Sequence, residues 1–247
     1  MRSCLWIAIA ASALLLHAAA EESPLTADQI VQKHVAALGG IDKLNAIRTL
    51  VVTGKASILG QLEAPLLIRV MRPNRMRLEI EFQGHTLVQA FDGVNAWTVN
   101  PMTGSGPKQS NEEDTRAAQE SSDFIGGNLV DYKSKGNTIE LVDKEDLDGV
   151  TVYQLKLTKK NGSVEYDYLD AESFLPVKTE AKRRQLGQEV RYESKISDYK
   201  PVEGVLMPFS VQQMVNGHLA MEIKIEKMDA NVPLDAAIFK MPEKPAQ

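Results

Sequence analysis

The stretch RMRLEIEF, residues 75–82, decides the fold class. Its apolar and charged residues alternate without exception. One side carries Met76, Leu78, Ile80 and Phe82, and the other carries Arg75, Arg77, Glu79 and Glu81. Successive side chains of a β-strand point to opposite faces of the sheet. The stretch therefore predicts a strand with one apolar and one solvated face, as in an antiparallel sheet.

The same period of two extends outward from this strand along most of the chain. Further alternating runs cover residues 50–58, 66–71, 151–158, 164–169, 174–182, 188–199, 205–215 and 219–228. Turn signals such as Asp92-Gly93, Asn161-Gly162 and Asn216-Gly217 separate the runs. We expect a mainly β protein of about a dozen strands in antiparallel up-and-down order, which curls into a barrel or half-barrel.

A few helices accompany the strands. Thr26 and Gln29 match a capping box, so a first helix is expected to begin there and to end at Gly39-Gly40. Residues 41–47 are expected to form one or two further helical turns, with Ile41, Leu44 and Ile47 facing inward.

One insertion, residues 101–136, interrupts the strands and is rich in Gly, Ser, Asn and acidic residues. Ser110 and Glu113 form a second capping box, which predicts a helix ending at about residue 124. The apolar residues that follow suit a lid over an opening, and a surface loop is the alternative. The candidate lid residues are Phe124, Ile125 and Leu129.

We predict that residues 1–20 are a secretory signal peptide. Arg2 supplies a positive start, residues 4–16 form a short apolar run, and an alanine-rich cleavage site ends at Ala20. A buried N-terminal helix is the alternative. Cleavage would remove the only cysteine and leave residues 21–247 as a single β domain outside the cytoplasm.

The rest of the composition argues against several kinds of site. The net charge is −5 without a lysine- or arginine-rich block, which disfavours nucleic-acid binding. His34, His85 and His218 lie far apart, so no metal site is predicted. No nucleophile elbow or phosphate-binding loop occurs, and Glu79 with Glu81 has the character of a solvated strand face. We therefore expect no cofactor, no catalytic residue and no enzymatic activity.

The interior is distinctive because methionine recurs where aromatic residues are few. The candidates are Met71, Met76, Met207, Met214, Met221 and Met228. Methionine adapts to ligands of variable shape, and an apolar interior binds an acyl chain with roughly 0.8 kcal/mol for each buried CH₂ group. A hollow, ligand-binding interior and a fully packed core both agree with this composition.

Several short segments resemble one known family. They are Arg72-Pro73-Asn74-Arg75-Met76-Arg77, residues 89–97, Tyr168-Leu169-Asp170, Leu175-Pro176-Val177-Lys178, Ser197-Asp198-Tyr199, residues 204–208, the opening HVAALGGIDKLNAI (34–47) and the closing FKMP (239–242). In this order they resemble the bacterial outer-membrane lipoprotein-sorting proteins, over nearly all of the mature chain. The resemblance implies a lipoprotein carrier-like, unclosed antiparallel half-barrel in the periplasm, covered by the N-terminal and inserted helices.

The resemblance also implies an apolar cavity that shields acyl chains. We expect it to be lined by Leu66, Ile68, Val70, Met76, Leu78, Ile80, Phe82, Phe91, Trp97 and Met221. The implied partners of this expected monomer are lipoproteins or acyl-chain lipids and an inner- or outer-membrane protein that receives the cargo. The alternatives are an envelope sensor that acts through protein contacts and, third, a lipid hydrolase.

Overall fold

The alternating stretch is strand β3 (Arg75–Phe82), and it lies inside one large antiparallel sheet. The computed structural model describes residues 24–103, 105–185 and 188–242. Within these residues the sheet has thirteen strands. The expected signal peptide, residues 1–20, lies outside the described residues, so its prediction stays a prediction.

Each strand pairs antiparallel with its neighbours. In spatial order they are β6 (Ser105–Gln109), β5 (Ala96–Asn100), β4 (His85–Phe91), β3, β2 (Leu62–Met71), β1 (Thr49–Ile58), β13 (His218–Ala230), β12 (Val205–Val215), β11 (Gln188–Val202), β10 (Pro176–Gln185), β9 (Val164–Asp170), β8 (Val150–Thr158) and β7 (Thr138–Leu147).

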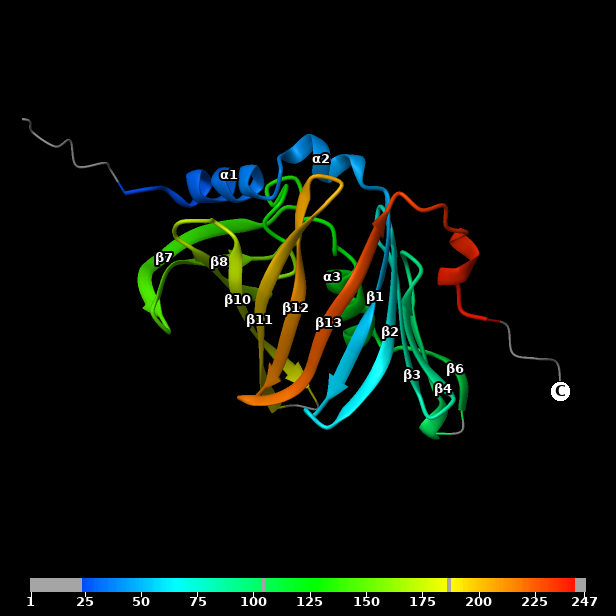
Figure 1. Ribbon diagram of the computed structural model, residues 1–247. Helices are drawn as coiled ribbons and strands as arrows, with labels where there is room; N and C mark the ends of the chain where they lie inside the picture. The colour runs from blue at the N-terminus through cyan, green and yellow to red at the C-terminus, as the bar shows by residue number, and fades with distance from the viewer. Residues whose placement is uncertain (1–23, 104, 186–187, 243–247) are drawn as a thin grey trace, which may run out of the picture.

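The sheet opens in the middle of the chain. The first strand pairs with the last, with Leu50 opposite Ala230, while β6 and β7 are the two free edges. Neighbours in the chain are otherwise neighbours in the sheet, which confirms the predicted unclosed half-barrel. Figure 1 shows the curved sheet, with the segment that contains α3 (Glu112–Ser121) joining its two free edges; the insertion thus contains a strand, β6, that the sequence did not predict.

Three helices and two 3₁₀ turns complete the described residues. They are α1 (Ala27–Ala37), α2 (Ile41–Ala46), η1 (Pro101–Thr103), α3 (Glu112–Ser121) and η2 (Ala236–Phe239). Thr26 and Gln29 form the predicted capping box of α1. Leu44 and Ile47 are buried as expected. No helix among the described residues is long and apolar enough to cross a membrane.

Helix α3 begins one residue later than the capping pattern predicts. The side chain of Asn111, and not that of Ser110, caps the helix by accepting a hydrogen bond from the backbone N–H of Asp114 at 2.8 Å. Ser110 is instead held beside the sheet, because its backbone N–H donates to the Ala96 carbonyl. The helix also ends at Ser121 and does not reach residue 124.

The main apolar core lies on the concave face of the sheet. The register places Leu66 opposite Ile80, Ile68 opposite Leu78 and Val70 opposite Met76, so the apolar side of β3 continues the apolar side of β2. Residues of α2 and of the insertion pack against this face. The helices therefore cover the interior, as the predicted fold class requires.

Candidate functional site

An apolar cavity of about 250 Å³ lies between the helices, the insertion and strands β11–β13. Its lining is mostly aliphatic and includes Leu38, Leu44, Phe124, Ile196, Val211 and Ile223. Five consecutive apolar residues, Val205–Phe209, bring β12 to its wall, and four of them line it. This cavity is the candidate site for an apolar ligand.

The predicted cavity residues lie beside this cavity more often than in its lining. Of the ten, Ile68 lines it. Leu66, Val70 and Ile80 are buried in the same core, and Met76, Leu78 and Met221 pack against that core. Phe91 is buried opposite Met76 in the register, and Phe82 is half-buried at the far end of β3. The observed cavity thus lies toward β11–β13, away from the predicted wall of β2–β4.

Trp97 lies on the other face of the sheet, which corrects its assignment to the cavity. It pairs with Ala90, whose neighbour Phe91 faces inward, so Trp97 faces outward. Its indole N–H donates to the Phe239 carbonyl at 2.8 Å, and the Arg77 guanidinium lies 5.3 Å from its ring centroid. Trp97 is buried because η2 covers the convex face there, a contact between distant parts of the chain.

The candidate lid residues are buried or line the apolar cavity. Ile125 and Leu129 are each 3% exposed, and Phe124 lines the apolar cavity. Arg72 fixes the segment, because its guanidinium donates to the carbonyls of Leu44 and Ile125 at 3.2 and 3.3 Å. The segment is therefore packed against α2.

A second, polar cavity of about 270 Å³ adjoins the apolar one. The two share the lining residues His34, Gly126, Gly127, Pro176 and Ile196. The remainder of the polar lining includes Glu120, Lys159, Glu165, Asp167, Thr179 and Arg183. Glu120 comes from α3, Lys159 from the turn after β8, and the others from β9 and β10.

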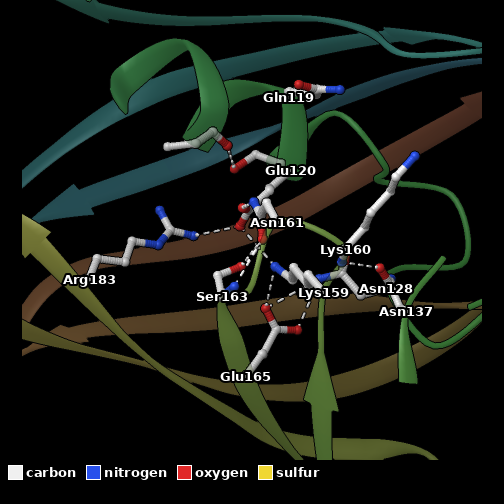
Figure 2. Close-up of polar contacts among 12 residues, drawn as sticks. Gln119, Glu120, Asn128, Asn137, Lys159, Lys160, Asn161, Ser163, Glu165 and Arg183 are labelled. Carbon is white, nitrogen blue, oxygen red and sulfur yellow. Dashed lines mark hydrogen bonds and ion pairs between the residues drawn. The ribbon is translucent and has the colours of Figure 1, made fainter. Parts of the chain in front are cut away.

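Lys159 lies at the centre of the charges in this polar cavity (Figure 2). Its ammonium is 2.8 Å from Glu120 and 3.0 Å from Glu165, and its side chain is 9% exposed. Burial alone raises the pKa of Glu120, but the hydrogen bond and charge of Lys159 outweigh it and hold that pKa below its usual range. Arg183 approaches Glu120 less closely, at 3.8 Å.

Asp167 is a buried carboxyl in this cavity whose hydrogen bonds are not all satisfied by the described residues. It lies on β9 opposite Leu155 and Thr179, and it is 4% exposed. Its Oδ2 has no hydrogen-bond partner within the described ranges. Burial, and after it the charge of Glu165, raises the pKa of the Asp167 carboxyl well above its usual range.

His34 contributes a second polar group where the two cavities meet. Its Nδ1 lies 2.9 Å from the Phe174 carbonyl, which can only accept, so Nδ1 carries the proton. Burial lowers the pKa of His34, which keeps the imidazole neutral. The other ring nitrogen, Nε2, is then a hydrogen-bond acceptor.

Sequence reasoning missed the polar cavity because β9 has an inverted pattern. In Val164–Asp170 the large aromatic residues, Tyr166 and Tyr168, face outward, while Glu165 and Asp167 face the interior. Tyr168 packs under Lys178, whose ammonium lies 4.7 Å from the ring centroid.

Among the described residues, no group of three or more His, Cys, Asp or Glu is arranged to hold a metal ion.

Comparisons with known proteins identify a family for the chain and structures that share its fold. A family model whose description reads "-like: Uncharacterized protein" matches residues 84–243, well over half of the chain. The chain belongs to this family. The matched segment runs from the start of β4 to just beyond η2, so it contains most of the lining of both cavities. A search of curated proteins finds no match.

Three solved structures share the fold of this family member. A LolA superfamily protein from Nitrosomonas europaea has a TM-score of 0.58 and 16% identity, over 88% of this chain and 98% of its own. A putative outer membrane lipoprotein-sorting protein domain from Vibrio parahaemolyticus has a TM-score of 0.56 and 14% identity, over 85% of this chain and 94% of its own. A DUF1329 family protein from Desulfovibrio piger has a TM-score of 0.57 and 13% identity, over 86% of this chain and 96% of its own. The predicted resemblance in fold is confirmed.

Proposed function

We propose that this protein binds an acyl chain, or a comparable apolar ligand, in the apolar cavity. It does so as a periplasmic carrier in the sorting of outer-membrane lipoproteins. The observation that carries the proposal is the aliphatic lining of that cavity, roofed by α1, α2 and Phe124. A cavity lined in this way does not hold water favourably, whereas an apolar ligand fills it well.

The size of the apolar cavity suits part of an extended chain. Engineered apolar cavities of about 150 Å³ bind a ligand as large as benzene, and this one is larger, at about 250 Å³. Each buried CH₂ group contributes roughly 0.8 kcal/mol. Release therefore requires a membrane or a partner protein that offers the chain a comparably apolar site.

The fold supports the carrier proposal by analogy. One of the structures that share it is that of a putative outer membrane lipoprotein-sorting protein domain. The charged groups beside the cavity favour binding over catalysis, because Lys159 is engaged by Glu120 and Glu165. We therefore propose a binding protein that works as a monomer and meets an inner- or outer-membrane partner.

Native mass spectrometry tests the proposal. The full chain is expressed in a Gram-negative bacterium, purified from the periplasm without detergent and measured before and after organic extraction. We expect a bound acyl species or lipopeptide that extraction removes. A ligand-free mass that also stays unchanged when lipopeptide or dodecanol is added would overturn the proposal.

A pair of matched variants locates the site. Val211→Trp places a large ring in the apolar cavity, so we expect this variant to be purified without ligand. Val142→Trp makes the same change on β7, where the side chain is half exposed, and should keep the ligand. Equal loading of both variants, with both folded, would place the ligand outside the cavity.

A further inference from the structure

The two adjoining cavities have the dimensions of one binding site. Small-molecule pockets usually measure about 300–1,000 Å³. The apolar and polar cavities, at about 250 and 270 Å³, each fall below that range, whereas together they reach it. They adjoin each other, because His34 and Gly126-Gly127 line both. A ligand that fills both has an apolar chain and a polar head.

The charges of the polar cavity indicate the sign of that head. Its lining contains three acidic residues and two basic ones. Lys159 is matched by Glu120 and Glu165. Asp167 remains as a nearly fully buried carboxyl, with an oxygen that no described residue contacts by a hydrogen bond. Buried polar groups in native proteins nearly always have partners, so this one calls for a partner that the described residues do not supply.

The neutral His34 points to the same kind of partner. With its proton on Nδ1 and engaged by the Phe174 carbonyl, its Nε2 is an acceptor. His34 lines both cavities, and Asp167 lines the polar one. The polar cavity therefore offers two groups to a head group that donates hydrogen bonds: the Nε2 of His34 and the carboxylate of Asp167 in its ionised form.

We propose that the polar cavity binds a protonated primary amine at the head of the ligand, with Asp167 as its counter-ion. This inference rests on the proposed function, because the apolar chain of the same ligand occupies the apolar cavity. An ammonium has three donors and no acceptor, which suits this set of groups. Its charge also favours the ionised form of Asp167 and so opposes the effect of burial.

An anionic head fits less well. The ammonium of Lys159 already has two carboxylate partners, which neutralise its charge. Arg183 is 39% exposed and its guanidinium lies over the Tyr192 ring, 5.3 Å from the centroid. A carboxylate or phosphate in this cavity would meet two basic side chains, Lys159 and Arg183, that both already lie within 4 Å of the Glu120 carboxylate.

Three ligands with the same twelve-carbon chain test the inference. Dodecylamine, dodecanol and dodecanoate are titrated into the full mature chain at pH 7, below their micelle concentrations, and Kd is measured by displacement of a fluorescent apolar probe. We expect dodecylamine to bind at least tenfold more tightly than dodecanol, and dodecanoate to bind most weakly. Asp167→Asn should bring dodecylamine to within about threefold of dodecanol and leave dodecanol unchanged.

Two more variants make the result specific. Asp148→Asn removes one negative charge from the exposed β7–β8 turn and should leave all three affinities unchanged. Glu165→Gln removes a charge from the cavity itself and should weaken dodecylamine several-fold, which keeps the test available if Asp167→Asn does not fold.

Each other outcome has a definite meaning. Equal affinities for the three ligands would overturn the amine head and leave the apolar site standing. Tighter binding of dodecanoate would assign the head group to Arg183 and overturn the inference. Failure of all three to bind would remove the proposed function and the inference together.

Discussion

The two walls of the half-barrel present opposite chemistry to its interior. Strands β2 and β3 turn Leu66, Ile68 and Ile80 inward, and these residues are buried against one another. Strands β9 and β10 turn Asp167 and Thr179 inward, together with Glu165, whose partner is Lys159. One wall is stabilised by removing apolar surface from water, and the other by ion pairs that must satisfy buried charges.

The difference shows why one sheet can serve two parts of a ligand. A continuous apolar interior would fix a chain without orienting it. A polar wall on one side distinguishes the two ends of the ligand, since an unpaired charge is disfavoured in the apolar cavity. His34 lines both cavities, so the orientation is set where the two cavities adjoin.

Loss of the central ammonium should have the largest effect on the polar wall. Lys159→Met leaves Glu120 and Glu165 largely buried without their counter-ion. We expect the free energy of unfolding to fall by about 3–5 kcal/mol in urea denaturation at pH 7.

An exposed lysine provides the control for that measurement. Lys182→Met breaks a surface pair with Glu189, in which both side chains are more than half exposed. The change should stay within about 1 kcal/mol. If the two variants lose equal stability, the charges of the polar wall are not sequestered and the comparison between the walls fails.

A cavity in the apolar wall should have the next largest effect. Leu66→Ala removes buried methyl groups and is expected to lower the free energy of unfolding by about 2–5 kcal/mol. Leu62→Ala, on the same strand but 47% exposed, should change it by about 0.5 kcal/mol or less. Similar losses for both would mean that β2 does not form the packed wall described above.

The pH dependence of stability should give the smallest effect. The pKa of Asp167 is raised in the folded protein above its usual value near 3.8, so the folded state holds a proton that the unfolded state releases. The contribution of Asp167 to stability is therefore full below about pH 4 and is lost as the pH rises through the folded pKa.

Asp167→Asn removes this titrating group, so the folded and unfolded states no longer differ in the proton that it binds. Urea denaturation from pH 4 to pH 8 should show wild type losing stability relative to the variant as the pH rises. The nearby Glu165 and Lys159 are present in both proteins, so their effects largely cancel in the difference. A difference that is constant across this range would show that Asp167 is ionised throughout.

The apolar wall could be predicted from the sequence, and the polar wall could not. Alternation in β3 is strict, and it fixes both the face and the class of sheet. In β12 the run Val205–Phe209 is apolar at every position, so no pattern identifies its inward face. In β9 the tyrosines suggest an apolar face that in fact points outward.

The interactions that complete the site are also too distant to be read from local pattern. Glu120 reaches Lys159 across 39 positions in the chain. The burial of Trp97 depends on η2, which lies near the C-terminal end of the chain and packs on the convex face of the sheet. A periodic pattern reports which face is apolar, but it does not report what later covers that face.

The pairing of the first strand with the last has a consequence for biogenesis. Leu50 pairs with Ala230, so one edge of β1 stays unpaired until nearly the whole chain has been synthesised. The apolar cavity is lined by β11–β13 and forms only at that stage. Contacts this distant in the chain form slowly. For the proposed periplasmic carrier, we therefore expect ligand binding only after translocation is complete, so that the protein would not capture lipid during its own export.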